Sequence, residues 1–276
     1  MATNRVSATG RLPRPPYPSE PVRPAPARAG VRVSAVAGGL SWASSRFSFV
    51  EDEVAGLRPF VRPGAVCLDI GAEYGLYTWA LSALSGPEGS VHSIEPLPGP
   101  AAWLRTAASA FGCDNVTVHR VALAARAQPG TMSLPRRRLL PVHGRAYLTE
   151  GANGPGPNTE FARSRSVATA VRTVDGLCHH LGLDRVDFIK ADVEGAEAAV
   201  LAGARRTLLR HRPSLLLEIE DRHLAKYDAR PAGLVAGLRG LGYSMYRWRE
   251  GGWHPEAAVT DDFRNYLFTT RPPTHD

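Results

Sequence analysis

Three carboxylates in this chain each follow a short apolar run, at the point where a buried parallel strand would end. These are Asp69, Glu95 and Asp192. The carboxyl ends of parallel strands meet at one edge of a doubly wound sheet, where such folds bind their ligands. A carboxylate at the second of these ends would accept hydrogen bonds from both ribose hydroxyls. Ala122, after the third predicted strand, would offer backbone and apolar contact to an adenine. The pattern predicts a nucleoside-binding site.

Two glycines follow the first of these acids, and an apolar helical pattern then begins at Leu76. Gly71 and Gly75 allow a tight turn in which a ligand approaches the backbone over the N-terminus of the next helix. The dinucleotide fingerprint opens with a glycine, whereas Asp69 stands in that place here. A carboxylate would repel a pyrophosphate but attract a cationic amino acid. S-adenosylmethionine, which carries an ammonium and a sulfonium, suits this turn better than NAD does.

Further side chains are candidates for catalysis. Asp192 belongs to 190-KADVEGAE-197, in which Glu194 and the following glycine turn the chain into the next helix. His223 and His143 are candidate proton acceptors, because the pKa of histidine normally lies nearest neutrality. The acids and His223 would also suit magnesium or manganese, but no tight ligand spacing indicates a metal.

Strand and helix patterns alternate along the chain, which is typical of βαβ units and a largely parallel sheet. Short apolar runs predict strands at 65–69, 90–95, 116–121, 186–190, 214–219, 243–248 and 265–270. Periodic apolar residues predict helices at 49–60, 76–84, 100–111, 174–181, 196–210 and 234–241.

The chain has 276 residues with 43% apolar content, enough for one sizeable core. We expect a disordered tail at residues 1–46, which contains seven arginines, one acid and many prolines, and one domain at residues 47–276. The segment 126–172 carries eight arginines against two acids, and we interpret it as an inserted, substrate-side loop. The net positive charges of these two segments together exceed the formal net charge of +7 of the whole chain, so the rest of the domain is mildly acidic. We therefore do not expect a nucleic-acid partner.

Three widely spaced cysteines form no Cys-x-x-Cys pair and no disulfide framework, so we expect a reducing, cytoplasmic environment. No apolar run approaches the roughly 20 residues that span a bilayer. Prolines and arginines interrupt the N-terminus where a signal peptide would need an apolar core. We therefore expect no membrane partner. The sequence does not indicate an oligomeric state.

The motifs together resemble the FkbM family of S-adenosylmethionine-dependent methyltransferases. The turn 69-DIGAEYG-75 is similar to the family's Asp-Ile-Gly-Ala-Asn-x-Gly, and Glu95-Pro96 stands at its second acidic position. The segment 171-VRTVDGL-177 is similar to the family's Val-x-Thr-Leu-Asp-x-Leu. The most specific match is 188-FIKADVEGAEAAVLAGA-204, which resembles the signature Ile-Lys-x-Asp-Val-Glu-Gly-Ala-Glu.

The resemblance covers about residues 49–225 and has one departure, Glu73, where asparagine is usual. A glutamate at this position could meet the ammonium group of the cofactor. The implied fold is α/β, a Rossmann-like class I methyltransferase fold: a doubly wound, mostly parallel seven-stranded sheet with an antiparallel last strand. The implied reaction is methyl transfer to a small hydroxylated acceptor, such as a sugar, a polyketide or another secondary metabolite.

The resemblance also implies roles for residues. Those expected to bind S-adenosylmethionine are Asp69, Gly71, Glu73, Tyr74, Gly75, Glu95, Ala122 and Asp192. Asp192 and Glu194 would line the reaction site, with His223 or His143 as the base that removes the hydroxyl proton. Three alternatives stay open: a nicotinamide oxidoreductase, a nucleic-acid methyltransferase that holds phosphates with its arginine-rich segments, and a non-catalytic protein on a methyltransferase scaffold.

Overall fold

The computed structural model describes residues 52–273, so the predicted tail and the first residues of the predicted helix 49–60 lie outside the described part. The described part of that helix is a 3-10 helix, η1 (Asp52–Leu57), instead of an α-helix. Val54 and Leu57 are buried against the core. They lie three residues apart and therefore share one face of a 3-10 helix.

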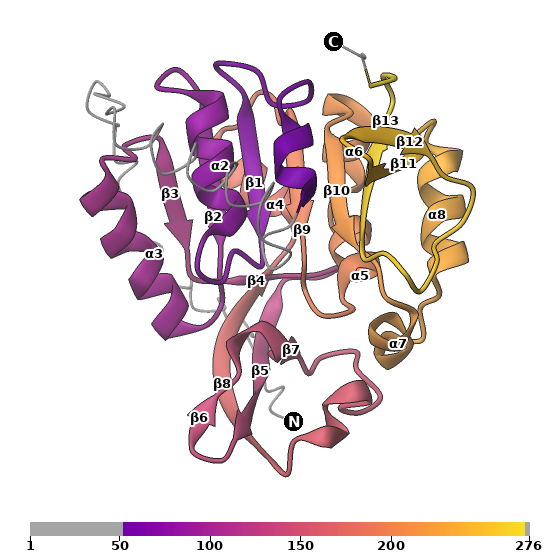
Figure 1. Cartoon of the computed structure of the whole chain (residues 1–276). Helices are drawn as coiled ribbons and strands as arrows, with labels where there is room; N and C mark the ends of the chain where they lie inside the picture. The colour runs from indigo at the N-terminus through magenta and orange to yellow at the C-terminus, as the bar shows by residue number, and fades with distance from the viewer. Residues whose placement is uncertain (1–51, 274–276) are drawn as a thin grey trace, which may run out of the picture.

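Eight strands of the described residues form a large sheet, and helices pack on both of its faces (Figure 1). In spatial order they are β12 (Gly252–Pro255), β11 (Ser244–Arg249), β13 (Asn265–Thr269), β10 (Ser214–Glu218), β9 (Phe188–Ala191), β1 (Val66–Ile70), β2 (Ser90–Ile94) and β3 (Val116–His119). The strands from β10 to β3 are parallel, whereas β13 is antiparallel to both of its neighbours. The predicted fold class is confirmed. The additional strand, β12, pairs with β11 as a hairpin and was not predicted.

Side chains of the central strands alternate between two cores, with the period of two that a strand imposes. Cys67 of β1 faces the core formed with η1 and α2, whereas Leu68 and Ile70 face the opposite core. Helices α2 (Leu76–Ser85) and α3 (Pro98–Phe111) cover the first face. The second face is covered by α4 (Val174–Leu181), α5 (Glu197–Ala202), α6 (Arg205–His211) and α8 (Pro231–Gly240).

The helix predicted at 196–210 is two helices, α5 and α6. Asp175 explains the break, because its carboxylate accepts the backbone N–H groups of Arg206 and Thr207, each at 2.9 Å. These are donors of the first turn of α6 that have no partner within the helix. The acid of the motif 171-VRTVDGL-177 therefore caps a helix more than 30 residues away in sequence.

The segment 126–172, where the sequence indicated a loop, contains most of a second, smaller sheet. Its strands are β4 (Ala122–Leu123), β8 (Arg163–Arg172), β5 (Gln128–Arg137) and β6 (Leu140–Pro141), with β7 (Tyr147–Leu148) paired to β5. Two 3-10 helices, η2 (His143–Arg145) and η3 (Gly156–Glu160), complete the insert. Figure 1 shows the small sheet beyond the carboxyl ends of the central strands, with β4 at the junction.

Two short helices, α7 (Asp221–Leu224) and η4 (Ala225–Tyr227), follow β10, and α7 contacts η3 of the insert. Among the helices described, none has the length and apolar character needed to cross a bilayer. Cys67, Cys113 and Cys178 are all buried and free.

Candidate active site

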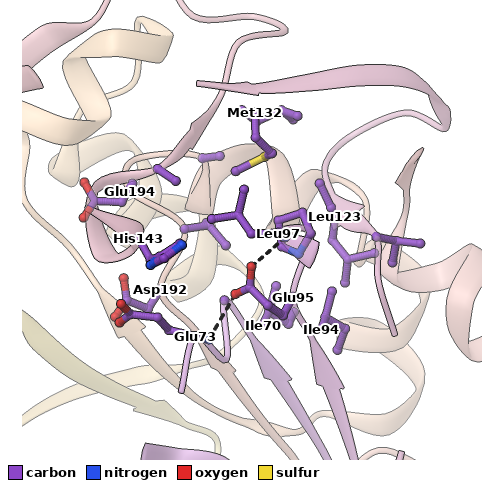
Figure 2. Close-up of a pocket in the computed structure, with 18 of the residues that line it drawn as sticks. Ile70, Glu73, Ile94, Glu95, Leu97, Leu123, Met132, His143, Asp192 and Glu194 are labelled. Carbon is purple, nitrogen blue, oxygen red and sulfur yellow. Dashed lines mark hydrogen bonds between the residues drawn. The ribbon is translucent and has the colours of Figure 1, made fainter. Parts of the chain in front are cut away.

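A pocket opens where the large sheet meets the insert. The space between its walls, including the part that is open to solvent, is about 690 Å³. Figure 2 shows Glu73, Asp192, Glu194 and His143 on one side, and Glu95 with the apolar side chains on the other. The lining residues are Ile70, Gly71 and Glu73 at the end of β1 and just after it; Ile94, Glu95, Pro96 and Leu97 at the end of β2 and just after it; Val121, Ala122 and Leu123 around β4; Asp192, Val193, Glu194 and Ala196 after β9; and Met132, His143, Gly144, Ala146 and Leu148 from the insert.

The turn between β1 and α2 requires glycine at two positions. Gly71 has a φ of +81°, and a Cβ atom there would lie 1.8 Å from the carbonyl oxygen of Asp192. Gly75 has a φ of +93°, and a Cβ atom there would lie 2.5 Å from the ring of Trp79. The first of these approaches brings two sequence motifs together at one site. Gly71 lines the pocket, whereas Gly75 supports the turn from behind.

Asp69 lies beneath the pocket and does not line it. Because strand alternation puts it on the same face as Cys67, its side chain points toward α2 and is only 2% exposed. The hydroxyl of Thr78 donates to its carboxylate at 2.5 Å and also contacts the hydroxyl of Ser93 at 2.8 Å. Burial raises the pKa of Asp69 to about 6. Asp69 thus ties together the strands and the helix that carry the turn.

Glu95 stands in the pocket, as the sequence predicts. It is 5% exposed, and its two oxygens accept the backbone N–H groups of Glu73 at 3.0 Å and Leu97 at 2.7 Å (Figure 2). Burial raises the pKa of Glu95 to about 7. A carboxylate has about four lone-pair sites, so Glu95 keeps acceptor capacity that faces the pocket.

Glu73 also lines the pocket, but its carboxylate is engaged by the insert. The backbone N–H of Gly144, in η2, donates to this carboxylate. Burial raises the pKa of Glu73, and the negative charges of Asp192 and Glu194 raise it further. The residue that departs from the family pattern therefore connects the turn after β1 to the insert.

The neighbouring residue makes a second contact with η2. The hydroxyl of Tyr74 lies 2.8 Å from Nδ1 of His143, and the two rings meet edge to face at 88°. Tyr74 is 48% exposed and stands at the rim, whereas His143 lines the pocket. Burial lowers the pKa of His143 below its ordinary value, so its imidazole is neutral at pH 7.

Asp192 lines the pocket at the end of β9, where the sequence predicts it. The ammonium of Lys190 lies 3.6 Å from its carboxylate, and the pKa of Asp192 is lowered because Lys190 and a hydrogen bond with Glu218 outweigh the effect of burial. Burial, together with the charge of Asp192, raises the pKa of Glu218 to about 11. Asp192 is therefore the ionised member of this pair, and Glu218 is a neutral donor.

Glu194 lies at the centre of a charged cluster between the pocket and the insert. Its Oε2 atom is 2.7 Å from Nδ1 of His223, 3.9 Å from Nζ of Lys226 and 4.0 Å from Nε of Arg145. Glu194 lines the pocket, but His223 is 3% exposed and stands behind it. The structure therefore does not bring His223 to the pocket.

Lys190 and Lys226 are functional candidates that the sequence reasoning missed. They are the only two lysines among 33 basic residues, and both are buried beside pocket carboxylates. A lysine ammonium is a compact point charge, which an arginine guanidinium cannot replace in a small space. Their scarcity in an arginine-rich chain was the signal that could have identified them.

The opposite wall of the pocket is apolar. Leu97, Leu123 and Met132 lie there with Ala122, which the sequence places at an adenine site (Figure 2). Residues 52–273 contain no group of three or more His, Cys, Asp or Glu side chains arranged to hold a metal ion.

Comparisons with known proteins agree with the motifs. Residues 69–245 match the Methyltransferase FkbM domain family, whereas a comparison with curated protein sequences finds no match. Similar solved structures include an FkbM methyltransferase from Methylobacillus flagellatus (TM-score 0.46, 17% identity, 86% of this chain and 58% of the other). A second is Aeropyrum pernix fibrillarin with bound S-adenosyl-L-methionine (TM-score 0.44, 15% identity, 83% of this chain and 76% of the other). A third is a Bacillus cereus O-methyltransferase in complex with SAH (TM-score 0.44, 10% identity, 87% of this chain and 90% of the other).

The strand order, the antiparallel β13 and the pocket at the strand ends are those of the Rossmann-like class I methyltransferase fold. The family match extends over more than half of the sequence, and the chain belongs to the FkbM family of S-adenosylmethionine-dependent methyltransferases. It spans 58% of the length of the Methylobacillus flagellatus protein.

Proposed function

We propose that this methyltransferase transfers a methyl group from S-adenosylmethionine to a hydroxyl oxygen of a small acceptor, such as a sugar, a polyketide or another secondary metabolite. One observation carries the proposal: His143 of the insert lines the same pocket as Glu95 and Asp192. A neutral imidazole thereby faces the groups suited to hold the cofactor.

The pocket residues fit this cofactor, which supplies a methyl group already activated by a sulfonium. Glu95 has acceptor capacity left for the ribose hydroxyls after its two backbone hydrogen bonds. Leu97, Ala122 and Leu123 form an apolar surface for the adenine. Gly71 also lines the pocket, and its lack of a side chain leaves room beside it for the carbonyl oxygen of Asp192.

The acidic side of the pocket suits the ammonium group. Asp192 is ionised, and Glu73 adds a second carboxylate on the same side (Figure 2). Glu73 takes the place of the usual asparagine in this role while it also holds η2. We assign supporting roles to Asp69, Tyr74 and Gly75, which shape the turn without lining the pocket.

His143 is the base in this proposal. When its Nδ1 donates to the hydroxyl of Tyr74, Nε2 is left as an acceptor. Nε2 would accept the proton of the acceptor hydroxyl, which makes its oxygen a better nucleophile toward the methyl group that the bound cofactor would supply, with S-adenosylhomocysteine as the leaving group. Asp192 and Glu194 line this side of the pocket and orient the acceptor, and the pocket holds both reactants in line.

The insert selects the acceptor in this scheme, because Met132, Ala146 and Leu148 of the insert line the same pocket as His143. The three buried, free cysteines fit a reducing compartment, which supports the expectation of a cytoplasmic enzyme.

The test is a methylation assay with S-adenosylmethionine and matched panels of hydroxylated and amine-bearing acceptors, read by mass spectrometry. We expect the mass of one methyl group on a hydroxylated acceptor, and a loss of roughly 100-fold in kcat with His143→Gln, in line with general-base catalysis. Methylation confined to amines would refute O-methylation. A variant with unchanged kcat would refute the role of His143.

A further inference from the structure

The far end of the small sheet carries a group of residues that the proposed reaction does not use, all of them exposed except the half-buried Arg136. We name it the basic tip: Arg136, Arg137, Arg138, Leu139 and Leu140 of the β5–β6 hairpin, with Arg163 and Arg165 of β8. Leu139 is 75% exposed and Leu140 is 74% exposed. Figure 1 shows this hairpin pointing away from the large sheet, and none of these residues lines the cofactor pocket.

The arginines of the basic tip gather on one short piece of sheet. Arg136 pairs with Arg163 across the β5–β8 ladder, and Arg165 lies opposite the buried Leu134. Within residues 52–273, no carboxylate forms an ion pair with any of the five arginines, and the nearby Glu160 pairs instead with Arg145. The tip therefore presents an uncompensated positive charge to the solvent.

The turn at the tip uses residue types that turn formation does not explain. Arg137 and Leu140 are the last pair of the hairpin, so Arg138 and Leu139 form a two-residue loop. Such loops favour glycine, asparagine and aspartate, because they require a positive φ. Here Arg138 has a φ of +56°, and a leucine stands beside it at the apex. An exposed leucine pair in this position indicates a partner outside the chain.

The order of the side chains along the hairpin identifies the kind of partner. Leu139 stands at the apex beside Arg138, Leu140 pairs with Arg137 one step behind, and the other three arginines stand further back. This order matches a bilayer interface, in which apolar groups enter below the lipid phosphates and guanidinium groups remain among them. A nucleic acid would bind the arginines but leave both leucines in water, and the ring of Phe161, which could stack on a base, already lies 5.8 Å from the guanidinium carbon of Arg137.

We propose that the basic tip docks on an anionic lipid surface, and that it does so peripherally. The sequence-based expectation of no membrane partner rested on the lack of a spanning segment, which peripheral docking does not need. Docking is independent of the identity of the cofactor and of the acceptor, because the tip and the pocket share no residue.

The test is co-sedimentation of the full chain with vesicles of phosphatidylcholine alone, or of equal parts phosphatidylcholine and phosphatidylglycerol. We expect binding to the anionic vesicles only. Arg137→Gln with Arg138→Gln should weaken it by roughly 25-fold, about five-fold for each arginine. Leu139→Ser with Leu140→Ser should weaken it by about 10-fold or more.

The matched control lies on α6, where Arg205, Leu209 and Arg210 are also exposed. Arg205→Gln with Arg210→Gln, and separately Leu209→Ser, should leave vesicle binding within two-fold of wild type, and circular dichroism establishes that every variant is folded. Wild-type protein that does not bind, or basic-tip variants that bind normally, would overturn the proposal. If only the arginine variants lose binding, and RNA competes, the tip binds a nucleic acid instead.

Discussion

The hydroxyl of Tyr74 lies 2.8 Å from Nδ1 of His143, which joins the turn after β1 to the insert. The neighbouring residue makes a parallel contact, because the N–H of Gly144 donates to the carboxylate of Glu73. Two consecutive residues of the turn thus hold two consecutive residues of η2. The element proposed to bind the cofactor therefore also positions the proposed base.

The Tyr74 contact can be tested by removing a single oxygen. We expect Tyr74→Phe to lower kcat by roughly 10-fold, because Nδ1 of His143 loses the partner that fixes its tautomer. The KM for S-adenosylmethionine should change less than two-fold, since Tyr74 does not line the pocket. Steady-state kinetics provides both values. Tyr246→Phe, on β11 and away from the pocket, is the matched control. An equal loss in both variants would contradict the assigned contact.

The pH dependence of the reaction should report His143. Burial lowers the pKa of this residue, so kcat at saturating S-adenosylmethionine, which does not include the binding of the cofactor, should rise with pH through a midpoint below the ordinary histidine value of about 6.5. Below the midpoint the imidazolium cannot accept a proton. His143→Gln should lose this limb of the profile. The same depressed pKa means that the unfolded chain binds the proton more readily, so this residue makes folding less favourable as pH falls below about 6.5. A limb that survives in His143→Gln would assign it to another group.

The close approach of Gly71 to Asp192 can be separated from backbone strain. Gly64 has a φ of +82°, nearly that of Gly71, but a Cβ atom there would meet nothing within 4 Å. Gly64→Ala should therefore lower the free energy of unfolding by about 1–2 kcal/mol, which is the cost of the left-handed backbone conformation alone. Gly71→Ala should cost about 4 kcal/mol or more and abolish cofactor binding, because Asp192 must move. Denaturant unfolding measures both costs, and equal values would show that the contact is not as close as described.

Lys190 and Asp192 should be coupled in stability. Lys190→Met leaves the carboxylate of Asp192 without its cation, and we expect it to lower the free energy of unfolding by about 3 kcal/mol. This value is at the lower end for a broken buried ion pair because Asp192 is partly exposed. Asp192→Asn in the same protein should recover part of this loss. A double-mutant cycle measured by urea unfolding gives the coupling energy. A coupling of zero would mean that the two groups do not interact in solution.

The large sheet could be predicted because its central strands and the helices between them have strong apolar patterns. Leu68, Ile70, Leu215 and Leu217 alternate with residues of the other core, as strand periodicity requires. The insert could not be predicted in this way, because β5 contains Pro129 and Pro135, which normally argue against a strand.

The structure shows why those prolines are tolerated. The carbonyl oxygen of Thr131 accepts the N–H of Thr149, and that of Pro135 accepts the N–H of Val142. The backbone N–H and C=O groups of the odd-numbered residues of β5 therefore point away from β8. Pro129 and Pro135 therefore remove no N–H from the β5–β8 ladder.

The site could be predicted in part. Strand ends and glycines identify Gly71, Glu95 and Asp192, because a parallel sheet brings its carboxyl ends to one edge. Sequence position alone could not separate Asp69, which faces α2, or His223, which lies behind Glu194, from residues that line the pocket. The direction of a side chain depends on packing partners that are distant in sequence.

The central claim is that the pocket around Glu95 binds S-adenosylmethionine, and calorimetric titration with S-adenosylhomocysteine tests it most directly. We expect a micromolar Kd for S-adenosylhomocysteine and no binding of NADH. We also expect tighter binding at a pH about one unit above 7 than at a pH about one unit below 7. The reason is that the pKa of Glu95 is about 7 and its carboxylate must be ionised to accept two hydroxyls. Glu95→Gln should weaken binding by roughly 10-fold or more and remove this pH dependence. A folded protein that does not bind S-adenosylhomocysteine, or a Glu95→Gln variant that binds it as wild type does, would contradict the claim.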